Sequence, residues 1–454
     1  MSLHYLFYYL VCMIASFTQT MIGLLAGIVI IILLTTKFKV HAFFALMFAC
    51  FVTGLILQMP VDSIISTMKD GFGNIMKSLG FIIVLGTTLG VLLEHTGSTK
   101  AMAGFILKKV GEKKAALAMS LTGFIVGLPV FCDSGYIVLN GLNKSLIRKT
   151  RIPTVVMSVS LATGLASVHC LIPPHPGAAA AASTIGADIG ALILYGIIVA
   201  IPAMLAAHWW AATKGKEFTY LSDEELIIEE DATAHPSPFQ AFLPVILPVI
   251  LIASRSFLIG GTNVNFITQI ITTSGEPVIA LSVGILLALN CKRGWKMPVL
   301  GLLSSESVEK AGSILVIIAA GGAFGAILTA AKLGDHLSGI TALQSMGILF
   351  PFLITSILKT AQGSSTVAII TAASIVQPFL SPLGLESETG KIICVLSMGA
   401  GSMMISHAND AFFWVISKFS GIPMNAMLKV YTTAMVIMAL VSLFVIYILS
   451  LFIL

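Results

Sequence analysis

The stretch KKAALAMSLTGFIVGLPVFCDSGYIVLNGLNKSLIRKTR, residues 113–151, decides how this chain folds. Basic residues stand at both of its ends, and two largely apolar arms lie between them, Ala115 to Leu128 and Ser134 to Asn143. A helix needs about 20 apolar residues to cross a membrane, whereas runs of about 10–14 are typical of segments that enter and return. The stretch therefore predicts a re-entrant hairpin, with GLPVFCDSG (residues 127–135) at its tip.

The composition of the chain places this hairpin in a membrane. Of 454 residues, 57% are hydrophobic and 10% are charged, against about 45–50% and about 25% in soluble domains. Apolar runs recur along nearly the whole chain, enough for on the order of ten to fourteen crossings. A soluble enzyme, a nucleic-acid binder and a disordered scaffold are excluded, and the continuous runs exclude a β-barrel. We predict an all-α, polytopic membrane protein in contact with lipid.

Neither the charge nor the cysteines indicate a nucleic-acid partner, a metal or a cofactor. The net charge is only +5, and the six cysteines are scattered through apolar segments without the spacing of metal ligands. We expect them to pack as small apolar side chains. Residues 1–20 are apolar but lack the basic start and cleavage site of a signal peptide, so we expect an N-terminal extension or a short helix there.

A polar stretch from Lys214 to Gln240 divides the chain near its middle. Shifting one half along the other by 235 residues aligns identical residues from position 45 to position 402. A constant offset over this length indicates an internal duplication. We predict a first repeat at residues 21–213, a central linker at 214–240 and a second repeat at 241–454. The aligned pairs include Gly86 with Gly321 (321 − 86 = 235), Gly164 with Gly399, and Ser167 with Ser402.

The basic loops indicate that the two repeats have opposite orientations. Loops rich in Lys and Arg stay on the cytoplasmic side. The basic loops of the first repeat map onto stretches without Lys or Arg; residues 108–114, for example, map onto 343–349. Conversely, the basic cluster at 292–296 maps back onto 57–61, which has none. Equivalent loops on opposite faces are typical of the inverted-topology repeats of secondary transporters.

Each repeat also contains a second irregular place at membrane depth. The second repeat has its own short arms, at 346–358 and 367–380, around the tip KTAQGSST (359–366). In addition, one long apolar stretch per repeat is interrupted, at PPHPG (173–177) and at SHAND (406–410). Non-helical backbone in a membrane occurs only where it is buried in protein or lines a cavity. The four places predict one central polar site, in which half-helix N-termini suit an anion and free carbonyls suit a cation.

The side chains at these places are the candidate binding groups. An unpaired carboxylate is costly in a membrane, and a histidine can titrate in the working range, but each has a structural alternative. The carboxylates can cap helices or pair with basic residues, the histidines can be satisfied structural groups, and Lys359 can extend to the interface. Candidates for substrate binding are Pro129, Asp133, Ser134, His175, Lys359, Gln362, Gly363, Ser364, Ser365, Thr366 and Asn409. Candidates for proton coupling are Asp133, His169, His407 and Asp410.

The assembled motifs resemble those of the gluconate permease family, gluconate:proton symporters that also include D-serine and other hydroxy-acid permeases. The resemblance implies a bacterial inner-membrane symporter with a fold similar to the ion-transporter superfamily of inverted repeats with paired hairpins. It extends from about residue 33 over nearly the whole chain, on five blocks in the family's order: GLPVFCDSGYIVL, HCLIPPHPGA, AGGAFGAIL, AQGSSTVAIIT and SHANDAFFWVISKF. By this resemblance the residues lining the site would be Asp133, His169, His175, Gly363, Ser364, Thr366, His407, Asn409 and Asp410.

Three departures from the family pattern leave the substrate open. Phe131-Cys132 replaces an aromatic pair, Ala178 replaces a proline, and Lys359 replaces an arginine. Lysine offers a point charge where arginine offers a bidentate fork. Gluconate, glycerate, D-serine and other hydroxy acids all stay candidates.

The sequence thus predicts a secondary transporter that imports a small hydroxylated monocarboxylate with protons. A sodium-coupled carboxylate or amino-acid symporter of the same fold is the alternative, with hydroxyls and carbonyls near residues 363–366 and 406–409 holding the ion. An intramembrane hydrolase is a third class, but neither a GxSxG nor an HExxH motif is present, so we expect no enzyme activity. A homo-oligomer is compatible with these features.

Overall fold

The structure is a computed structural model. In the part of the chain that it describes, every regular element is a helix and no strand occurs, which confirms the all-α class. The described residues are 17–218, 236–258, 266–330, 345–407 and 410–454.

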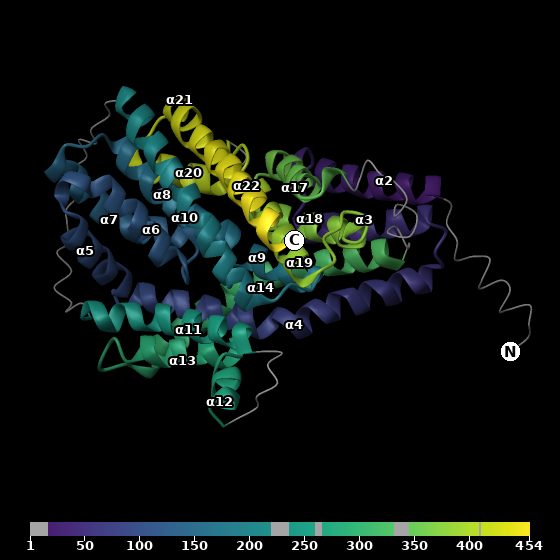
Figure 1. Ribbon diagram of the computed structural model, residues 1–454, viewed down its shortest axis with the longest axis horizontal. Helices are drawn as coiled ribbons and strands as arrows, with labels where there is room; N and C mark the ends of the chain where they lie inside the picture. Colours follow the sequence, from purple (N-terminus) through teal and green to yellow (C-terminus); the bar gives the residue numbers. More distant parts are fainter. Residues whose placement is uncertain (1–16, 219–235, 259–265, 331–344, 408–409) are drawn as a thin grey trace, which may run out of the picture.

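Most helices of the first half are joined by short turns (Figure 1). In chain order they are α2 (Phe17–Thr36), α3 (Ala42–Ile56), α4 (Val61–His95), α5 (Ser98–Val110), α6 (Ala115–Gly127), α7 (Cys132–Thr150), α8 (Thr154–Leu171), α9 (Pro176–Ile185) and α10 (Ile189–Lys214).

The described helices of the second half follow a similar order. They are α11 (Pro238–Leu258), α12 (Phe266–Ser274), α13 (Pro277–Leu289), α14 (Met297–Ala330), α17 (Leu349–Gln362), α18 (Ser365–Val376), α19 (Glu388–Gly401), α20 (Ala411–Ser420), α21 (Met424–Ala426), the π-helical turn η4 (Met427–Thr432) and α22 (Thr433–Ile453).

Among the described residues, six helices are long and apolar enough to cross a membrane, or seven if the bent pair α12 and α13 counts as one. This is fewer than the ten to fourteen crossings expected from the total apolar length. The difference arises because much of the apolar sequence forms short helices, such as α6, α18 and α20, which are too short to cross alone.

The helix bounds recur at the 235-residue offset. Helix α4 shifted by 235 would cover residues 296–330, and α14 covers 297–330. Helix α9 shifted in the same way covers 411–420, which are the bounds of α20. These corresponding helices of the two halves therefore have similar lengths and are separated by the same 235 residues. The division into two repeats of opposite orientation remains a prediction.

Two long helices, α4 and α14, pack side by side across the molecule (Figure 1). Glycines make this close approach possible. A Cβ atom built on Gly71 would lie 2.5 Å from the carbonyl oxygen of Gly322, and one built on Gly322 would lie 2.3 Å from the side chain of Ile75. Small residues at the contact are the usual way for helices in a membrane to pack tightly.

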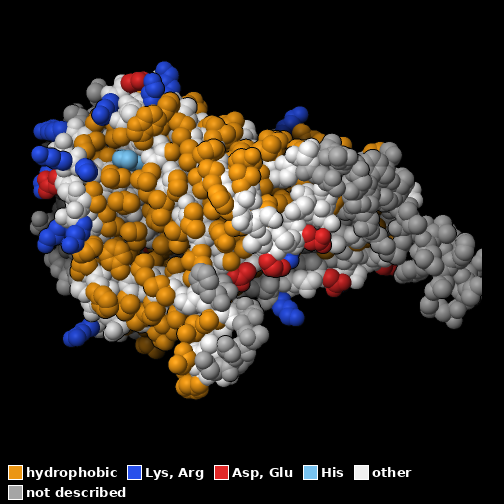
Figure 2. Space-filling model, viewed as in Figure 1, with side chains coloured by type: hydrophobic (Ala, Val, Ile, Leu, Met, Phe, Trp, Pro, Cys, Tyr) orange, Lys and Arg blue, Asp and Glu red, His pale blue; other side chains and the backbone are white. Residues whose placement is uncertain are grey.

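The outer surface carries a broad apolar area with basic side chains at one end (Figure 2). Lys108 and Lys109 lie in the last turn of α5, and Arg148 and Lys149 lie in the last turn of α7. Both helices lie at the left of Figure 1, and basic side chains gather on the same side of Figure 2. Because loops rich in Lys and Arg remain cytoplasmic, we expect this end to face the cytoplasm.

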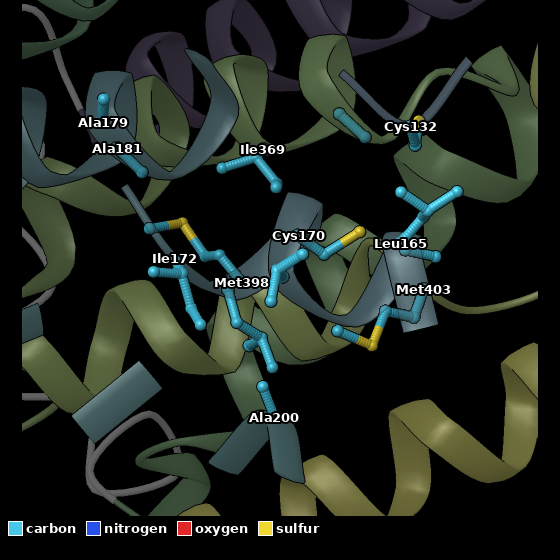
Figure 3. Packing of buried hydrophobic residues seen from close by; sticks show 14 of the residues in the cluster. Cys132, Leu165, Cys170, Ile172, Ala179, Ala181, Ala200, Ile369, Met398 and Met403 are labelled. Atoms are coloured by element: carbon cyan, nitrogen blue, oxygen red, sulfur yellow. The ribbon is translucent and has the colours of Figure 1, made fainter. Parts of the chain in front are cut away.

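The interrupted helix α8 and α9 runs through the centre of the protein. Every residue of α8 except His169 is buried. Figure 3 shows apolar side chains from several helices meeting there, including Leu165 of α8, Ala179 of α9, Ile369 of α18 and Met398 of α19. The core therefore holds the interruption between α8 and α9 against the second half of the chain.

Candidate functional site

Two helical hairpins approach the centre from different sides. The first consists of α6 and α7 with residues 128–131 between them, and the second of α17 and α18 joined through Gly363 and Ser364. Gly363 has a φ of +83°, which favours glycine and lets the chain reverse at once. The first hairpin lies at the left of Figure 1 and the second just right of its centre.

The first hairpin differs from its prediction in the length of the second arm. The apolar pattern suggests an arm that ends at Asn143, whereas α7 continues to Thr150. The last turns contain Lys144 and Arg148, and Lys149 forms an ion pair of 2.6 Å with Glu112. Charged residues can extend a helix past the apolar region, so the end of the apolar run does not mark the end of the helix.

The first interruption lies where the sequence places it, whereas the second begins four residues before the expected Ser406. Helix α8 ends at Leu171, just before Pro173, and α9 begins at Pro176. Helix α19 ends at Gly401, and α20 begins at Ala411, with Asp410 as its N-cap. The Oδ1 atom of Asp410 accepts a hydrogen bond of 3.0 Å from the backbone N–H of Phe412.

A cavity of about 480 Å³ lies where the hairpin tips meet α8, α14 and α20. The N-termini of α7, α18 and α20 all border it, because residues 131–134, 364–367 and 410–412 are in its wall. The first N–H groups of a helix have no partner within the helix and carry partial positive charge. Three converging N-termini form an environment that suits an anion.

Eight of the predicted site residues lie in the cavity wall. They are Asp133, Ser134, His169, Gln362, Ser364, Ser365, Thr366 and Asp410. Pro129 and His175 instead border a separate hollow of only about 10 Å³ against α4. The Nε2 atom of His407 donates to the carbonyl oxygen of Thr360 at 3.2 Å, outside the cavity wall. Asn409 lies outside the described residues.

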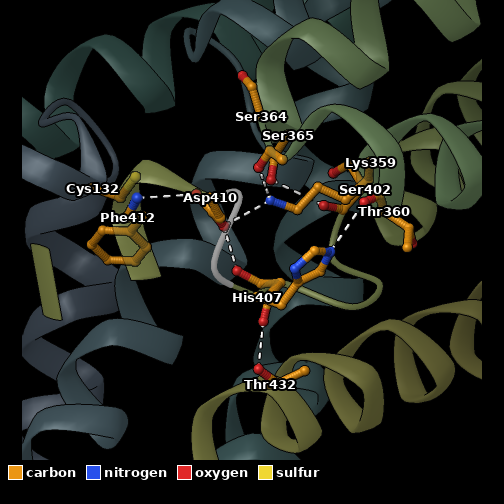
Figure 4. A network of polar contacts seen from close by, with 12 residues as sticks. Cys132, Lys359, Thr360, Ser364, Ser365, Ser402, His407, Asp410, Phe412 and Thr432 are labelled. Atoms are coloured by element: carbon orange, nitrogen blue, oxygen red, sulfur yellow. Dashed lines mark hydrogen bonds and ion pairs between the residues drawn. The ribbon is translucent and has the colours of Figure 1, made fainter. Parts of the chain in front are cut away.

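Lys359 and Asp410 form a buried ion pair beside the cavity (Figure 4). The Lys359 Nζ atom lies 2.7 Å from Asp410 Oδ2 and also donates to the carbonyl oxygen of Gly363, while the hydroxyl of Ser406 donates to the same carboxylate. The side chain of Lys359 is 0% exposed. Lys359 therefore ties the second tip to the interruption before α20 and does not itself line the cavity.

The two aspartates consequently have different surroundings. Asp410 caps α20 and pairs with Lys359, which is the structural arrangement considered for it from the sequence. Asp133 lies in the cavity wall, and none of the ion pairs of the described residues includes it. Its contact is a long hydrogen bond of 3.9 Å from the thiol of Cys132.

The two histidines at the first interruption contact each other, with ring centroids 4.8 Å apart. His175 donates from Nε2 to the carbonyl oxygen of Gly127 at 2.5 Å, which holds the interruption against α6. A hydrogen bond of 3.3 Å joins Nε2 of His169 to the hydroxyl of Thr366, so His169 connects α8 to the second tip.

Several polar atoms of the cavity wall are buried without a hydrogen-bond partner among the described residues. They are both atoms of the Gln362 amide, Nδ1 of His169 and the hydroxyl of Tyr431. Buried polar groups are nearly always paired. These atoms have almost no exposed area of their own, so a ligand in the cavity would reach them only after a change of side-chain rotamer.

Three polar wall residues were not predicted from the sequence: Lys310, Ser313 and Tyr431. Lys310 and Ser313 lie on α14, in a stretch with several charged residues that reads as a solvated helix face. Tyr431 lies in the π-helical turn η4 and is a single polar residue in an apolar run. Among the described residues, no group of three or more His, Cys, Asp or Glu side chains could hold a metal ion.

Long apolar helices, paired hairpins and a central polar cavity define a membrane transporter. Over residues 19–452 the chain matches the model of the family described as GntP family permease, and it belongs to that family. It is 34% identical over 438 residues to a gluconate permease of Pseudomonas aeruginosa, covering 94% of this chain and 96% of that protein. It is 30% identical over 430 residues to the D-serine transporter DsdX of Escherichia coli K12, covering 92% and 96%. These relatives are named permeases and transporters, not enzymes.

A solved structure has the same overall fold. The YdaH transporter of Alcanivorax borkumensis superimposes with a TM-score of 0.63 over 87% of this chain and 90% of that one. The sequence identity is 13%, so this likeness concerns the fold alone. The predicted class, a polytopic all-α transporter of the gluconate permease family, is confirmed.

Proposed function

We propose that this protein imports a small hydroxylated monocarboxylate, such as gluconate, by proton symport across the cytoplasmic membrane of a bacterium. The observation that carries the proposal is the convergence of three helix N-termini on one cavity. Partial positive charge at helix N-termini stabilises a carboxylate without a mobile cation. The names of the relatives, gluconate permease and D-serine transporter, support the same class of substrate.

The substrate hydroxyls would complete the polar wall. The Gln362 amide can donate and accept, Nδ1 of His169 can do either according to its tautomer, and the Tyr431 hydroxyl can do both. A polyhydroxylated acid would supply the donors and acceptors that these atoms lack, once a change of rotamer turns them toward the cavity. Selectivity follows, because a substrate without hydroxyls would leave these atoms buried and unpaired.

Asp133 is the proposed proton carrier. An ionisable residue at membrane depth is a functional candidate, above all when it faces a cavity. Asp133 lies in the cavity wall and has no ion pair within the described part of the chain, whereas Asp410 is fixed by Lys359 and Ser406. Protonation of Asp133 would cancel the negative charge that the substrate carboxylate brings, so the loaded site would carry the same net charge as the empty one.

Alternating exposure of this site would move substrate and proton together. We propose that the two hairpins enter from opposite membrane faces, as the constant helix spacing and the one-sided basic loops support. In such a fold one substructure moves against the other around the bound substrate.

The test is uptake of radiolabelled gluconate by proteoliposomes under separately imposed proton and sodium gradients, with unlabelled glycerate, D-serine and other hydroxy acids as competitors. Accumulation driven by the proton gradient supports the proposal, and the order of the competitors identifies the substrate. Accumulation that persists with an uncoupler but requires sodium supports the sodium-coupled alternative. If neither gradient drives accumulation of any of these acids, the proposal is wrong.

A further inference from the structure

We infer that Lys310 on α14 binds the carboxylate of the transported substrate and so selects acids over neutral analogues. This inference rests on the proposed function and names a residue for it. Lys310 lies in the cavity wall with Ser313, Ile314 and Ile317. These residues follow one another at helical spacing, so a single face of α14 closes the cavity opposite the hairpin tips.

The other lysine near the cavity is not available for this role. Lys359 is fully buried, and its ammonium group is held by Asp410 and by the carbonyl oxygen of Gly363. A substrate carboxylate would have to displace a buried charge partner to reach it. Lys310 is 34% exposed, and among the described residues it is the Lys or Arg that lines the cavity.

The present partner of Lys310 can be exchanged. Its Nζ atom lies 2.7 Å from Glu306, one helical turn earlier, and the Glu306 side chain is 46% exposed. Exposed pairs between residues four apart on a helix contribute little to stability. A carboxylate in the cavity can therefore replace Glu306 as the partner of Lys310.

The positive charge of Lys310 on α14 has no counterpart at the equivalent position of α4. Position 310 corresponds at the 235-residue offset to Ile75 on α4, whereas Ser313 corresponds to Ser78. The lysine is thus not part of the pattern that the two halves have in common. It lies in the wall of the cavity at the hairpin tips, where a basic side chain also attracts anions from solution.

The experiment compares gluconate with its neutral amide, gluconamide, as competitors of radiolabelled gluconate uptake in proteoliposomes. Lys310→Met should raise the KM for gluconate about tenfold or more, as expected for the loss of a charge-assisted hydrogen bond. The preference for gluconate over gluconamide should shrink by a similar factor, while the inhibition constant of gluconamide changes little. Lys310→Arg should restore most of the preference.

Lys391→Met is the matched control. Lys391 also pairs with a glutamate on its own helix, Glu388 at 2.8 Å, but it does not line the cavity. A preference for gluconate in Lys310→Met equal to that of Lys391→Met overturns the inference and leaves the proposed function intact. If the wild-type protein takes up none of the acids, the proposed function and this inference fail together. A purely structural role would lower uptake of both variants of Lys310 without changing the preference.

Discussion

The two hairpin tips have similar helices around them but different electrostatics. At the second tip, Lys359 forms a buried pair with Asp410 of the nearby interruption. At the first tip, Asp133 faces the cavity without an ion pair among the described residues. A neutralised pair holds elements together, whereas an unpaired carboxylate at a cavity can change its protonation. We therefore expect the second tip to stabilise the structure and the first tip to couple transport to protons.

The largest expected effect is at the second tip. Lys359→Met leaves Asp410 buried without its partner, which should cost about 3–5 kcal/mol of stability. The midpoint of thermal unfolding in detergent should fall sharply, and uptake should be lost with it. The double variant Lys359→Met/Asp410→Asn should regain much of the midpoint, since it leaves no unpaired charge. If Lys359→Met has the same unfolding midpoint as the wild type, the Lys359–Asp410 pair does not stabilise the protein.

The first tip should respond in the opposite way. Asp133→Asn should leave the unfolding midpoint nearly unchanged, because Asp133 forms no ion pair with any residue that the structure describes. Accumulation of gluconate against its gradient should disappear, while exchange of internal for external gluconate persists. Counterflow and gradient-driven uptake, measured on the same vesicles, separate the two activities. Gradient-driven accumulation at the wild-type level in Asp133→Asn would remove Asp133 from the proton path.

A smaller effect should come from the helix that supports the first tip. A Cβ atom on Gly164 of α8 would lie 2.2 Å from the carbonyl oxygen of Ser120 on α6, while one on the equivalent Gly399 would lie 2.6 Å from the carbonyl oxygen of Cys170. Gly164→Ala should therefore cost about 1–3 kcal/mol by overpacking, and Gly399→Ala less. Thermal unfolding of both variants gives the order, and the reverse order would contradict the packing described for the two halves.

The smallest effect is expected at Tyr431. Its hydroxyl is buried without a partner among the described residues, so Tyr431→Phe should not lower the unfolding midpoint. If a substrate hydroxyl completes this group, the KM for gluconate should rise about two- to tenfold, the value of one neutral hydrogen bond. Ser442→Ala on α22, which does not line the cavity, is the control. An unchanged KM would exclude Tyr431 from substrate binding.

The sequence predicts the irregular places well because they leave local signals. Short apolar arms between basic residues mark the first hairpin, and Pro173 and Pro174 mark the end of α8. Such signals depend on a few neighbouring residues, so they can be recognised without knowledge of the tertiary structure. The matching bounds of α9 and α20 follow for the same reason, since each helix begins directly after an interruption.

The pairing of charges could not be predicted in this way. Lys359 and Asp410 are 51 positions apart, and only the packing of the second tip against the interruption brings them together. The role of Lys310 was hidden for a related reason: its neighbours Glu306 and Glu309 make its surroundings look like a solvated helix face. Which charged residue reaches the cavity depends on how α14 lies against the two hairpins, and periodicity along one helix does not contain that information.

The most direct test of proton coupling is the proton movement itself. Gluconate is added outside proteoliposomes that contain a pH-sensitive dye and have no imposed ion gradient, with the membrane potential clamped by potassium and valinomycin. The account predicts acidification of the interior as gluconate enters, and no acidification with Asp133→Asn. Entry of labelled gluconate into wild-type vesicles without any change in internal pH would contradict it.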